Sequence, residues 1–119
     1  MARFRISRLA RADPVRILAT SAERWGTEGR RRYAAVIATA MRQVASDPDG
    51  VATRDRSEFL RGVRSFHIRH ARADDSAPKV MRPAHILYYR AIRPGLVEIV
   101  RVLHERMEPS RHISEASED

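Results

Sequence analysis

Two apolar, strand-forming segments on either side of a tight-turn signal constrain the fold of this chain most. Residues 83–92 (PAHILYYRAI) and 95–104 (GLVEIVRVLH) are rich in Val, Ile, Leu and Tyr, and the tripeptide RPG at 93–95 separates them. Proline presets the backbone for a turn, and glycine adopts the positive φ that many turns require. We therefore expect a β-hairpin here, with residues 58–68 (EFLRGVRSFHI) as a third strand.

Neither face of the predicted hairpin is cleanly polar. Ile86 and Tyr88 alternate with Leu87 and Tyr89, so both faces carry large apolar side chains. An antiparallel sheet that has helices on one face normally alternates apolar and polar residues. We therefore expect another layer over the second face, and a partner polypeptide is the candidate for that layer.

The start of the chain predicts a strand and a helix. Residues 3–7 (RFRIS) alternate apolar and polar side chains, which is typical of a half-buried strand. Asp13 followed by proline is a helix start signal. Apolar residues then recur at three- and four-residue steps, which predicts a core-facing stripe made of Val15, Leu18, Ala22 and Trp25.

A glycine predicts the end of this helix and a reversal of the chain. Gly26 suits the left-handed position that closes a helix, and residues 27–48 (TEGRRRYAAVIATAMRQVASDP) carry the apolar stripe of a second helix. Two helices joined so tightly lie antiparallel. The predicted fold is therefore α+β, with an N-terminal strand, an antiparallel two-helix hairpin, and then a three-stranded antiparallel meander that completes one sheet.

The length of 119 residues fits one domain. We expect this domain to span residues 1–113, followed by an acidic, disordered tail over residues 114–119 (SEASED). The polar segment 69–82 predicts a surface excursion between two strands.

The composition limits the cellular location and the classes of binding partner that we expect for this protein. The formal net charge of +8 indicates an anionic partner, which is nucleic acid or an acidic protein. Cysteine is absent, so disulfides and thiolate chemistry are excluded. No apolar run is long enough to span a membrane, and we expect a cytoplasmic protein that has no membrane contact.

Known metal, nucleotide and hydrolase motifs are missing. His67 and His70 lie three residues apart, and such a pair points to opposite faces of a strand, so it does not predict a zinc site. The sequence contains no P-loop, no GxGxxG and no GxSxG motif. We expect neither a metal nor a cofactor.

Acid–base and cationic groups are the chemistry that remains. A metal-free ribonuclease needs a general base, a general acid and cations that stabilise the charged transition state. Six residues can supply these roles: His104, His85, Tyr89, Arg90, Arg101 and Arg64. The alternative is that the tyrosine packs within the sheet and the arginines pair with acidic neighbours, and residue types alone leave both interpretations open.

Several motifs resemble those of ParE-type toxins of the RelE/ParE toxin–antitoxin superfamily. They are FRIS near the start, ERWG followed by RRY, then GVR, HILYYR and RVLHERMEP, and together they cover about residues 3–113. Residues 66–82 depart from the resemblance because this connection is longer than usual. The resemblance implies a RelE/ParE-like fold.

The resemblance also implies a function. It implies the plasmid- or chromosome-borne toxin of a type II toxin–antitoxin pair, in a hetero-oligomer with a ParD-like antitoxin. Such an antitoxin has a ribbon-helix-helix N-terminus, so the toxin contacts DNA only indirectly. The implied target is DNA gyrase, inhibited by protein binding without catalysis.

An alternative stays open, which is a ribosome-dependent, metal-independent mRNA endoribonuclease of the RelE type. Its catalytic candidates are His104, Arg101, Tyr89 and Arg90. Ile86 stands where the similar YoeB-type ribonucleases carry an arginine, which favours the gyrase hypothesis. On that hypothesis the antitoxin- or target-binding residues are Arg64, His85, Tyr89, Arg90, Arg101, His104 and Arg106.

Overall fold

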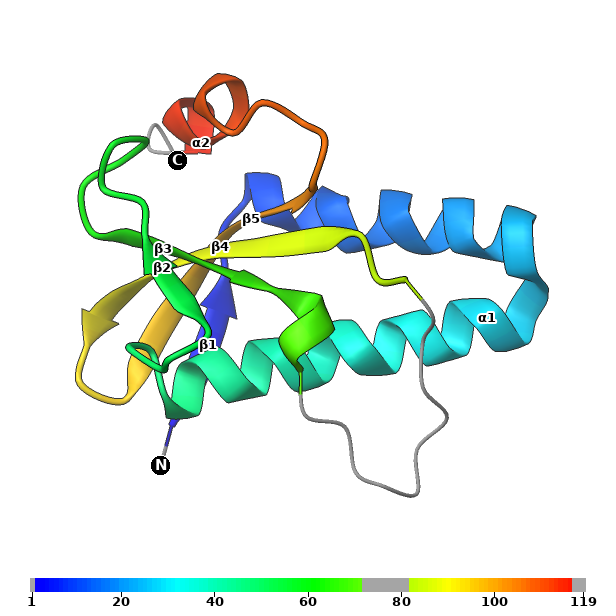
Figure 1. Cartoon of the computed structure of the whole chain (residues 1–119), viewed down its shortest axis with the longest axis horizontal. Helices are drawn as coiled ribbons and strands as arrows, with labels where there is room; N and C mark the ends of the chain where they lie inside the picture. The colour runs from blue at the N-terminus through cyan, green and yellow to red at the C-terminus, as the bar shows by residue number, and fades with distance from the viewer. Residues whose placement is uncertain (1, 72–81, 117–119) are drawn as a thin grey trace.

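A five-stranded sheet and two α-helices make up the part of the chain that the computed structural model describes, residues 2–71 and 82–116 (Figure 1). The elements follow the chain in the order β1 (Arg3–Ile6), η1 (a 3-10 helix, Leu9–Arg11), α1 (Ala12–Ser46), β2 (Thr53–Asp55), β3 (Val63–His67), η2 (a 3-10 helix, Ile68–His70), β4 (His85–Arg93), β5 (Leu96–His104) and α2 (Ser110–Ala116). The α+β class predicted from the sequence is confirmed.

The sheet has the strand order β1-β5-β4-β3-β2. Strand β1 runs parallel to β5, whereas the other neighbouring strands are antiparallel. The strands β4 and β5 form the predicted hairpin, and Gly95 in its turn has a φ of 83°. The predicted set of three strands after the helices is wrong, because the short β2 adds a fourth strand at the edge of the sheet.

The helical region also differs from the prediction of two separate helices. Residues 12–46 form one element, α1, in which Gly26 leaves helical geometry with φ 73° and ψ −173°. No intervening loop is needed, because this single glycine lets the ribbon reverse direction at the far right of Figure 1. Gly26 divides α1 into a first arm, residues 12–25, and a second arm, residues 27–46. The second arm packs on the sheet through Tyr33, Ile37 and Val44, among others.

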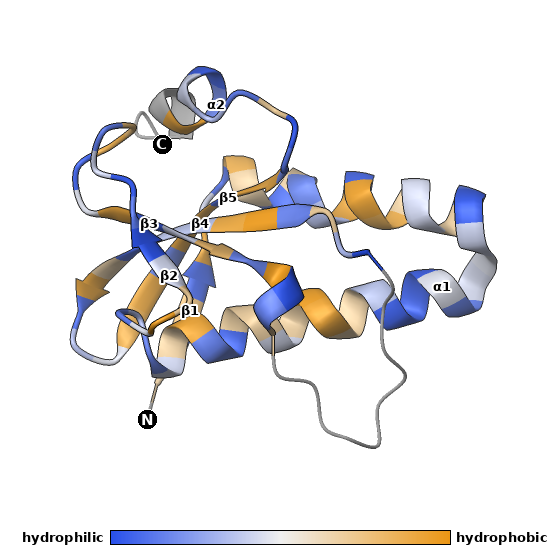
Figure 2. Ribbon diagram, in the orientation of Figure 1, coloured by the Kyte–Doolittle hydropathy of each residue, from blue (hydrophilic) through white to orange (hydrophobic). Residues whose placement is uncertain are grey.

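The predicted core-facing stripe on the first arm of α1 is wrong at both ends. Val15 is 71% exposed and Trp25 is 58% exposed, whereas Ile17, Leu18 and Ser21 face inwards. The hairpin of α1 extends beyond the strands, so residues near its turn have no sheet beneath them (Figure 1). Colouring by hydropathy agrees, since β5 and much of β4 are orange whereas the turn end of α1 is mostly blue or pale (Figure 2).

The second face of the sheet is the one opposite α1, and its apolar side chains are covered by the chain itself. Val63, Tyr88, Val100 and Leu103 are buried there against Ile113 of α2. Residues of η1 and of the β2–β3 connection complete this cluster: Leu9, Phe59 and Leu60. The expectation that a partner must cover these side chains is therefore wrong, because short segments of this chain already do so.

A shift in the β4–β5 register explains why apolar residues occur on both faces of β5. Tyr88 pairs with Arg101 whereas Tyr89 pairs with Ile99, so β5 carries one extra residue at this point. The bulge changes the alternation of side chains along the strand. As a result Val102 joins Ile99 in the core under α1.

Two further expectations concern segments at the limit of the described residues. Residues 72–81 of the predicted excursion lie outside the described residues, as do residues 117–119 of the predicted tail. Residues 114–116 belong to α2. None of the helices in the described part of the chain is both long enough and apolar enough to cross a membrane.

The geometry of Gly26 generates a stability prediction. Its φ and ψ lie in a region that is essentially restricted to glycine, and other residues there cost about 1–3 kcal/mol. A Cβ atom would meet nothing within 4 Å, so the cost comes from the backbone and not from a clash. Gly26→Ala should therefore lower the free energy of unfolding by about 1–3 kcal/mol in urea titrations.

The exposed neighbour Thr27 provides the control for this change. Thr27→Ala should alter the free energy of unfolding by less than about 0.5 kcal/mol. Equal stability of the two variants would contradict the assignment of the chain reversal to Gly26.

Candidate partner-binding cleft

The structure does not bring the predicted site residues together. They fall into three places: a buried ion pair that contains Arg101, a cleft that contains His85 and His104, and the two faces of the β3–β4 region. Each place constrains what its residues can do.

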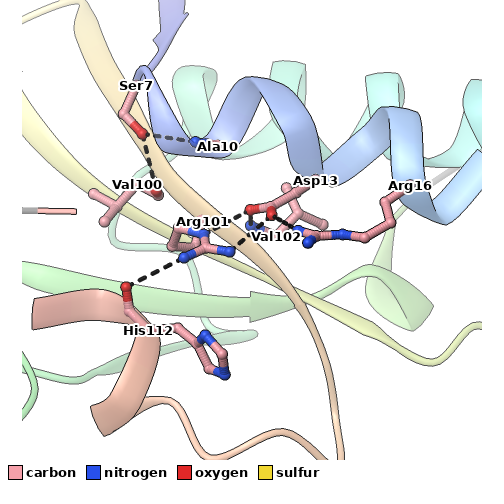
Figure 3. Close-up of polar contacts among 8 residues, drawn as sticks. All are labelled: Ser7, Ala10, Asp13, Arg16, Val100, Arg101, Val102 and His112. Atoms are coloured by element: carbon pink, nitrogen blue, oxygen red, sulfur yellow. Dashed lines mark hydrogen bonds and ion pairs between the residues drawn. The ribbon is translucent and has the colours of Figure 1, made fainter. Parts of the chain in front are cut away.

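Arg101 lies in a buried network that joins three elements (Figure 3). Its Nε and Nη2 atoms donate to the Asp13 carboxylate of α1 at 2.8 and 2.9 Å, and its Nη1 donates to the His112 carbonyl of α2 at 3.3 Å. The side chains of Arg101 and Asp13 are 8% and 1% exposed. Two further donors reach the same carboxylate, namely the Val102 amide at 2.9 Å and Arg16 Nη2 at 2.7 Å.

This network has a structural role. A buried charge is tolerated only when it is paired and its hydrogen bonds are satisfied. Asp13 meets both conditions, and it also accepts from the backbone of β5 beyond the point where β1 ends. Arg101 is thereby neutralised and enclosed, so it is not available as a free cation for a phosphate.

Tyr89 and Arg64 lie on the face of the sheet that α1 covers or borders. Tyr89 is fully buried and its hydroxyl donates to the Pro48 carbonyl. Arg64 donates to Thr53 Oγ1 and forms a 3.6 Å ion pair with Asp49. Burial raises the pKa of Tyr89, so its hydroxyl is unsuited to be a base.

Arg90 lies on the opposite face of the sheet from Tyr89. Its Nη2 donates to Glu98 on β5 at 3.1 Å, and Glu98 also accepts from Arg5 on β1 at 2.9 Å. These contacts form a row across three strands. The structure therefore separates Arg90 and Tyr89 from His104, although the sequence suggested that they act together.

His85 and His104 do meet, in a cleft between the first arm of α1 and the ends of the β4–β5 hairpin. The cleft has a volume of about 350 Å³. Its lining includes Ile17, Trp25 and Met107 as apolar groups. Wider depressions elsewhere in the described part of the chain lack this combination of a histidine pair and an exposed tryptophan.

The cleft is both apolar and basic. Trp25 and Met107 are 58% and 38% exposed, so they place apolar surface together in the lining of the cleft. Three arginines also contribute to its lining: Arg16, Arg24 and Arg82, all of them exposed. A surface of this kind suits an acidic polypeptide that has apolar side chains of its own.

The histidine pair is held by Tyr33 and by the backbone. Tyr33 Oη lies 2.6 Å from His85 Nδ1, and the two rings meet edge to face. Burial, followed by repulsion from His104, lowers the pKa of His85 to about 4. His85 is therefore neutral at pH 7, and burial also raises the pKa of Tyr33.

A third histidine lies on the neighbouring strand. His67 Nε2 is 2.7 Å from Glu105 Oε2, and this hydrogen bond lowers the pKa of Glu105. Within residues 2–71 and 82–116, no group of three or more His, Cys, Asp or Glu side chains is placed to hold a metal ion. The residues of this region act as hydrogen-bonding and charged groups.

Sequence patterns missed most of the cleft. Trp25 was assigned to the core, and Asp13 was interpreted only as a helix start signal. A detectable signal existed, because Asp13, Ile17 and Ser21 also recur at helical spacing and mark the side of the first arm that is buried or half-buried. Trp25 continues this four-residue series and lines the cleft with the other three residues, but it is 58% exposed.

These features define a class of protein, namely a small α+β domain with an exposed cleft that is basic and partly apolar. Residues 4–109 match the family described as the ParE toxin of type II toxin-antitoxin system, parDE. Toxin ParE1 of Caulobacter vibrioides (strain ATCC 19089 / CIP 103742 / CB 15) is 31% identical over 111 residues, which cover 92% of this chain and 96% of that protein. Toxin ParE1 of Mycobacterium tuberculosis (strain ATCC 25618 / H37Rv) is 27% identical, with coverages of 93% and 97%.

The chain belongs to the ParE toxin family of type II toxin–antitoxin systems, since the family match spans most of its length. The resemblance inferred from the sequence motifs is confirmed. Membership in this family implies an antitoxin partner.

The buried network around Asp13 generates a second stability prediction. Asp13→Asn would leave Arg101 enclosed without a counter-charge, and breaking a buried pair in this way costs about 3–5 kcal/mol. Urea unfolding should show this loss. Glu23→Gln, at an exposed position on the same arm of α1, should change stability by less than about 0.5 kcal/mol. A loss below about 1 kcal/mol for Asp13→Asn would contradict the structural role of the pair.

Proposed function

We propose that this toxin inhibits DNA gyrase in the cytoplasm by protein contact and is neutralised by a ParD-like, ribbon-helix-helix antitoxin. In this proposal the chain catalyses no reaction. DNA is contacted only through the antitoxin, within a toxin–antitoxin hetero-oligomer. The domain responsible is taken to span residues 1–113.

The separation of the candidate catalytic groups supports the protein-contact mechanism. Ribonucleases that lack a metal need a base, an acid and cations around one phosphate. Here Arg101 is committed to Asp13, Tyr89 is buried against Pro48, and Arg90 is on the other face of the sheet. His104 is therefore separated from these three proposed co-catalysts, which favours protein contact over mRNA cleavage as the mechanism.

The cleft supports the neutralisation part of the proposal. It presents an exposed tryptophan and methionine beside three arginines, on a chain whose formal net charge is +8. Interface hot spots are enriched in tryptophan and arginine, and charge complementarity accelerates association with acidic partners. An acidic, amphipathic segment of the antitoxin is the occupant that this chemistry fits.

The residues predicted from the sequence to bind the antitoxin or the target receive different proposed roles, depending on whether they line the cleft. His85 and His104 remain proposed contact residues because they line the cleft, and Arg106 follows directly after this region. Arg101 is proposed to act by positioning β5. Arg64 and Arg90 remain candidates for gyrase contact only, since neither is among the residues that line the cleft. The fully buried Tyr89 is proposed to support the sheet and not to contact gyrase.

The target is tested with purified components. The full chain should inhibit negative supercoiling by DNA gyrase, and premixing it with one equivalent of the antitoxin encoded beside it should restore supercoiling. In a reconstituted translation reaction, mRNA should stay intact in the presence of the same toxin preparation.

The double variant Arg90→Ala/His104→Ala is the control for cleavage, because it spares the buried pair of Asp13 and Arg101. It should behave like the wild type in the translation reaction. Codon-specific mRNA cuts by the wild type that vanish in this variant, without any effect on gyrase, would overturn the proposal.

A further inference from the structure

His85 and His104 are direct cross-strand partners at the inner end of the cleft. They pair across β4 and β5, and their rings meet edge to face with centroids 5.3 Å apart. Both rings line the cleft. The hydrogen bond at each Nδ1 atom determines whether the Nε2 atom of the same ring carries a proton.

The backbone sets the tautomer of His104. Its Nδ1 accepts a hydrogen bond from the Arg106 amide at 3.1 Å. A neutral imidazole that accepts at one nitrogen carries its proton on the other. His104 therefore presents an Nε2–H donor.

Tyr33 sets the tautomer of His85 in the same sense. The Tyr33 hydroxyl oxygen accepts from the Ala84 amide at 3.0 Å, so its own proton is free to point at His85 Nδ1, 2.6 Å away. His85 Nδ1 is then an acceptor, and the ring proton is on Nε2. The two histidines therefore offer the same kind of group, which is an N–H donor.

Neither Nε2 atom is already used. No hydrogen bond reaches either atom from the described residues, and neither belongs to the side-chain atoms sealed from solvent without a partner. Among the described residues, the one carboxylate that lines the cleft belongs to Asp13, which already accepts from Arg101, Arg16 and the Val102 amide. The described part of the cleft thus has donors and cations but lacks a free carboxylate.

We propose that His85 and His104 form a carboxylate-binding subsite, in which their paired Nε2–H groups hold an Asp or Glu side chain of an acidic peptide segment. The inference rests on the proposed function, because the segment is taken to belong to the antitoxin. The apolar groups Ile17, Trp25 and Met107 beside the pair suit a peptide better than an isolated anion.

Such a subsite couples binding to proton uptake. In the free toxin, burial and then repulsion from His104 and from His67 on β3 lower the pKa of His85. Glu105 and Asp13 oppose the effect. Among the described residues, the other charged or titratable groups around the cleft are Tyr33, Arg16, Arg24, Arg82 and Arg106. A bound carboxylate would offset the repulsion and raise the pKa of His85.

The sign of the pH dependence follows from this shift. The pKa of His85 in the free toxin is about 4, and it is higher in the complex. The complex therefore binds more protons than the free toxin at any pH between the two values, so affinity strengthens as the pH falls through this window. Antitoxin affinity should rise about five- to tenfold from pH 8 to pH 5.5.

Calorimetry on the full chain with its antitoxin tests this coupling of binding to proton uptake without any substitution. Titrations at pH 6 in two buffers of different ionisation enthalpy should report net proton uptake on binding. Tight binding with no proton uptake and a flat pH profile would overturn the subsite while leaving the proposed function intact. An absence of antitoxin binding at every pH would instead overturn both.

Three variants distinguish hydrogen-bond donation by the two histidines from the effect of their protonation. The double variant His85→Gln/His104→Gln keeps N–H donors but cannot take up a proton, so it should bind within about threefold of wild type at pH 8 and lose the pH dependence. His104→Leu should bind about tenfold more weakly at both pH values. His112→Gln changes a histidine of α2 outside the cleft and should leave affinity and pH dependence unchanged.

A titration with two small anions identifies the chemical class of the group that the subsite binds. N-acetylglutamate and inorganic phosphate are each titrated into the free toxin while the imidazole resonances of His85 and His104 are followed by NMR. The carboxylate should shift both histidines and leave His112 unchanged. Shifts of both histidines with phosphate, together with no response to the carboxylate, would contradict a carboxylate subsite.

Discussion

The buried pair of Asp13 and Arg101 is the interaction on which the rest of the structure depends. It joins the first turn of α1 to β5, and the same guanidinium reaches the backbone of α2. The pair therefore links the strand β5 to two helices, α1 through the Asp13 carboxylate and α2 through the Arg101 guanidinium. A well-packed apolar pair would fill the same space, but it would not fix the direction of five hydrogen bonds. The end of β5, and with it His104, is held in place by this network.

Much of the fold was predictable because it depends on local signals. The tight turn at 93–95, the alternation in β1 and the reversal at Gly26 are each encoded by a few adjacent residues. The Asp13–Arg101 pair was not predictable in this way, since its partners are 88 positions apart and each had a plausible local interpretation. Trp25 was misplaced for a related reason, because periodicity identifies a stripe without revealing how far the sheet extends beneath it.

The position of the open surface follows from how the chain covers its own sheet. Ile113 of α2 and the residues around Phe59 bury the apolar side chains of the second face, so that face does not need a partner for its stability. The hairpin of α1 extends past the sheet and leaves Trp25 and Met107 exposed above the histidine pair. Exposed apolar side chains beside three arginines therefore lie at the cleft, whereas the apolar side chains of the second face are buried, which moves the expected antitoxin contact to this edge of the molecule.

Antitoxin binding by a pair of α1 variants tests this placement most directly. Trp25 and Val15 are both exposed apolar residues on the first arm, but only Trp25 lines the cleft. Titration calorimetry should show that Trp25→Ala weakens antitoxin binding by about 30-fold or more, whereas Val15→Ala changes it by less than about twofold. Equal affinities for Trp25→Ala and the wild type, with both variants folded, would contradict the cleft as the site of neutralisation.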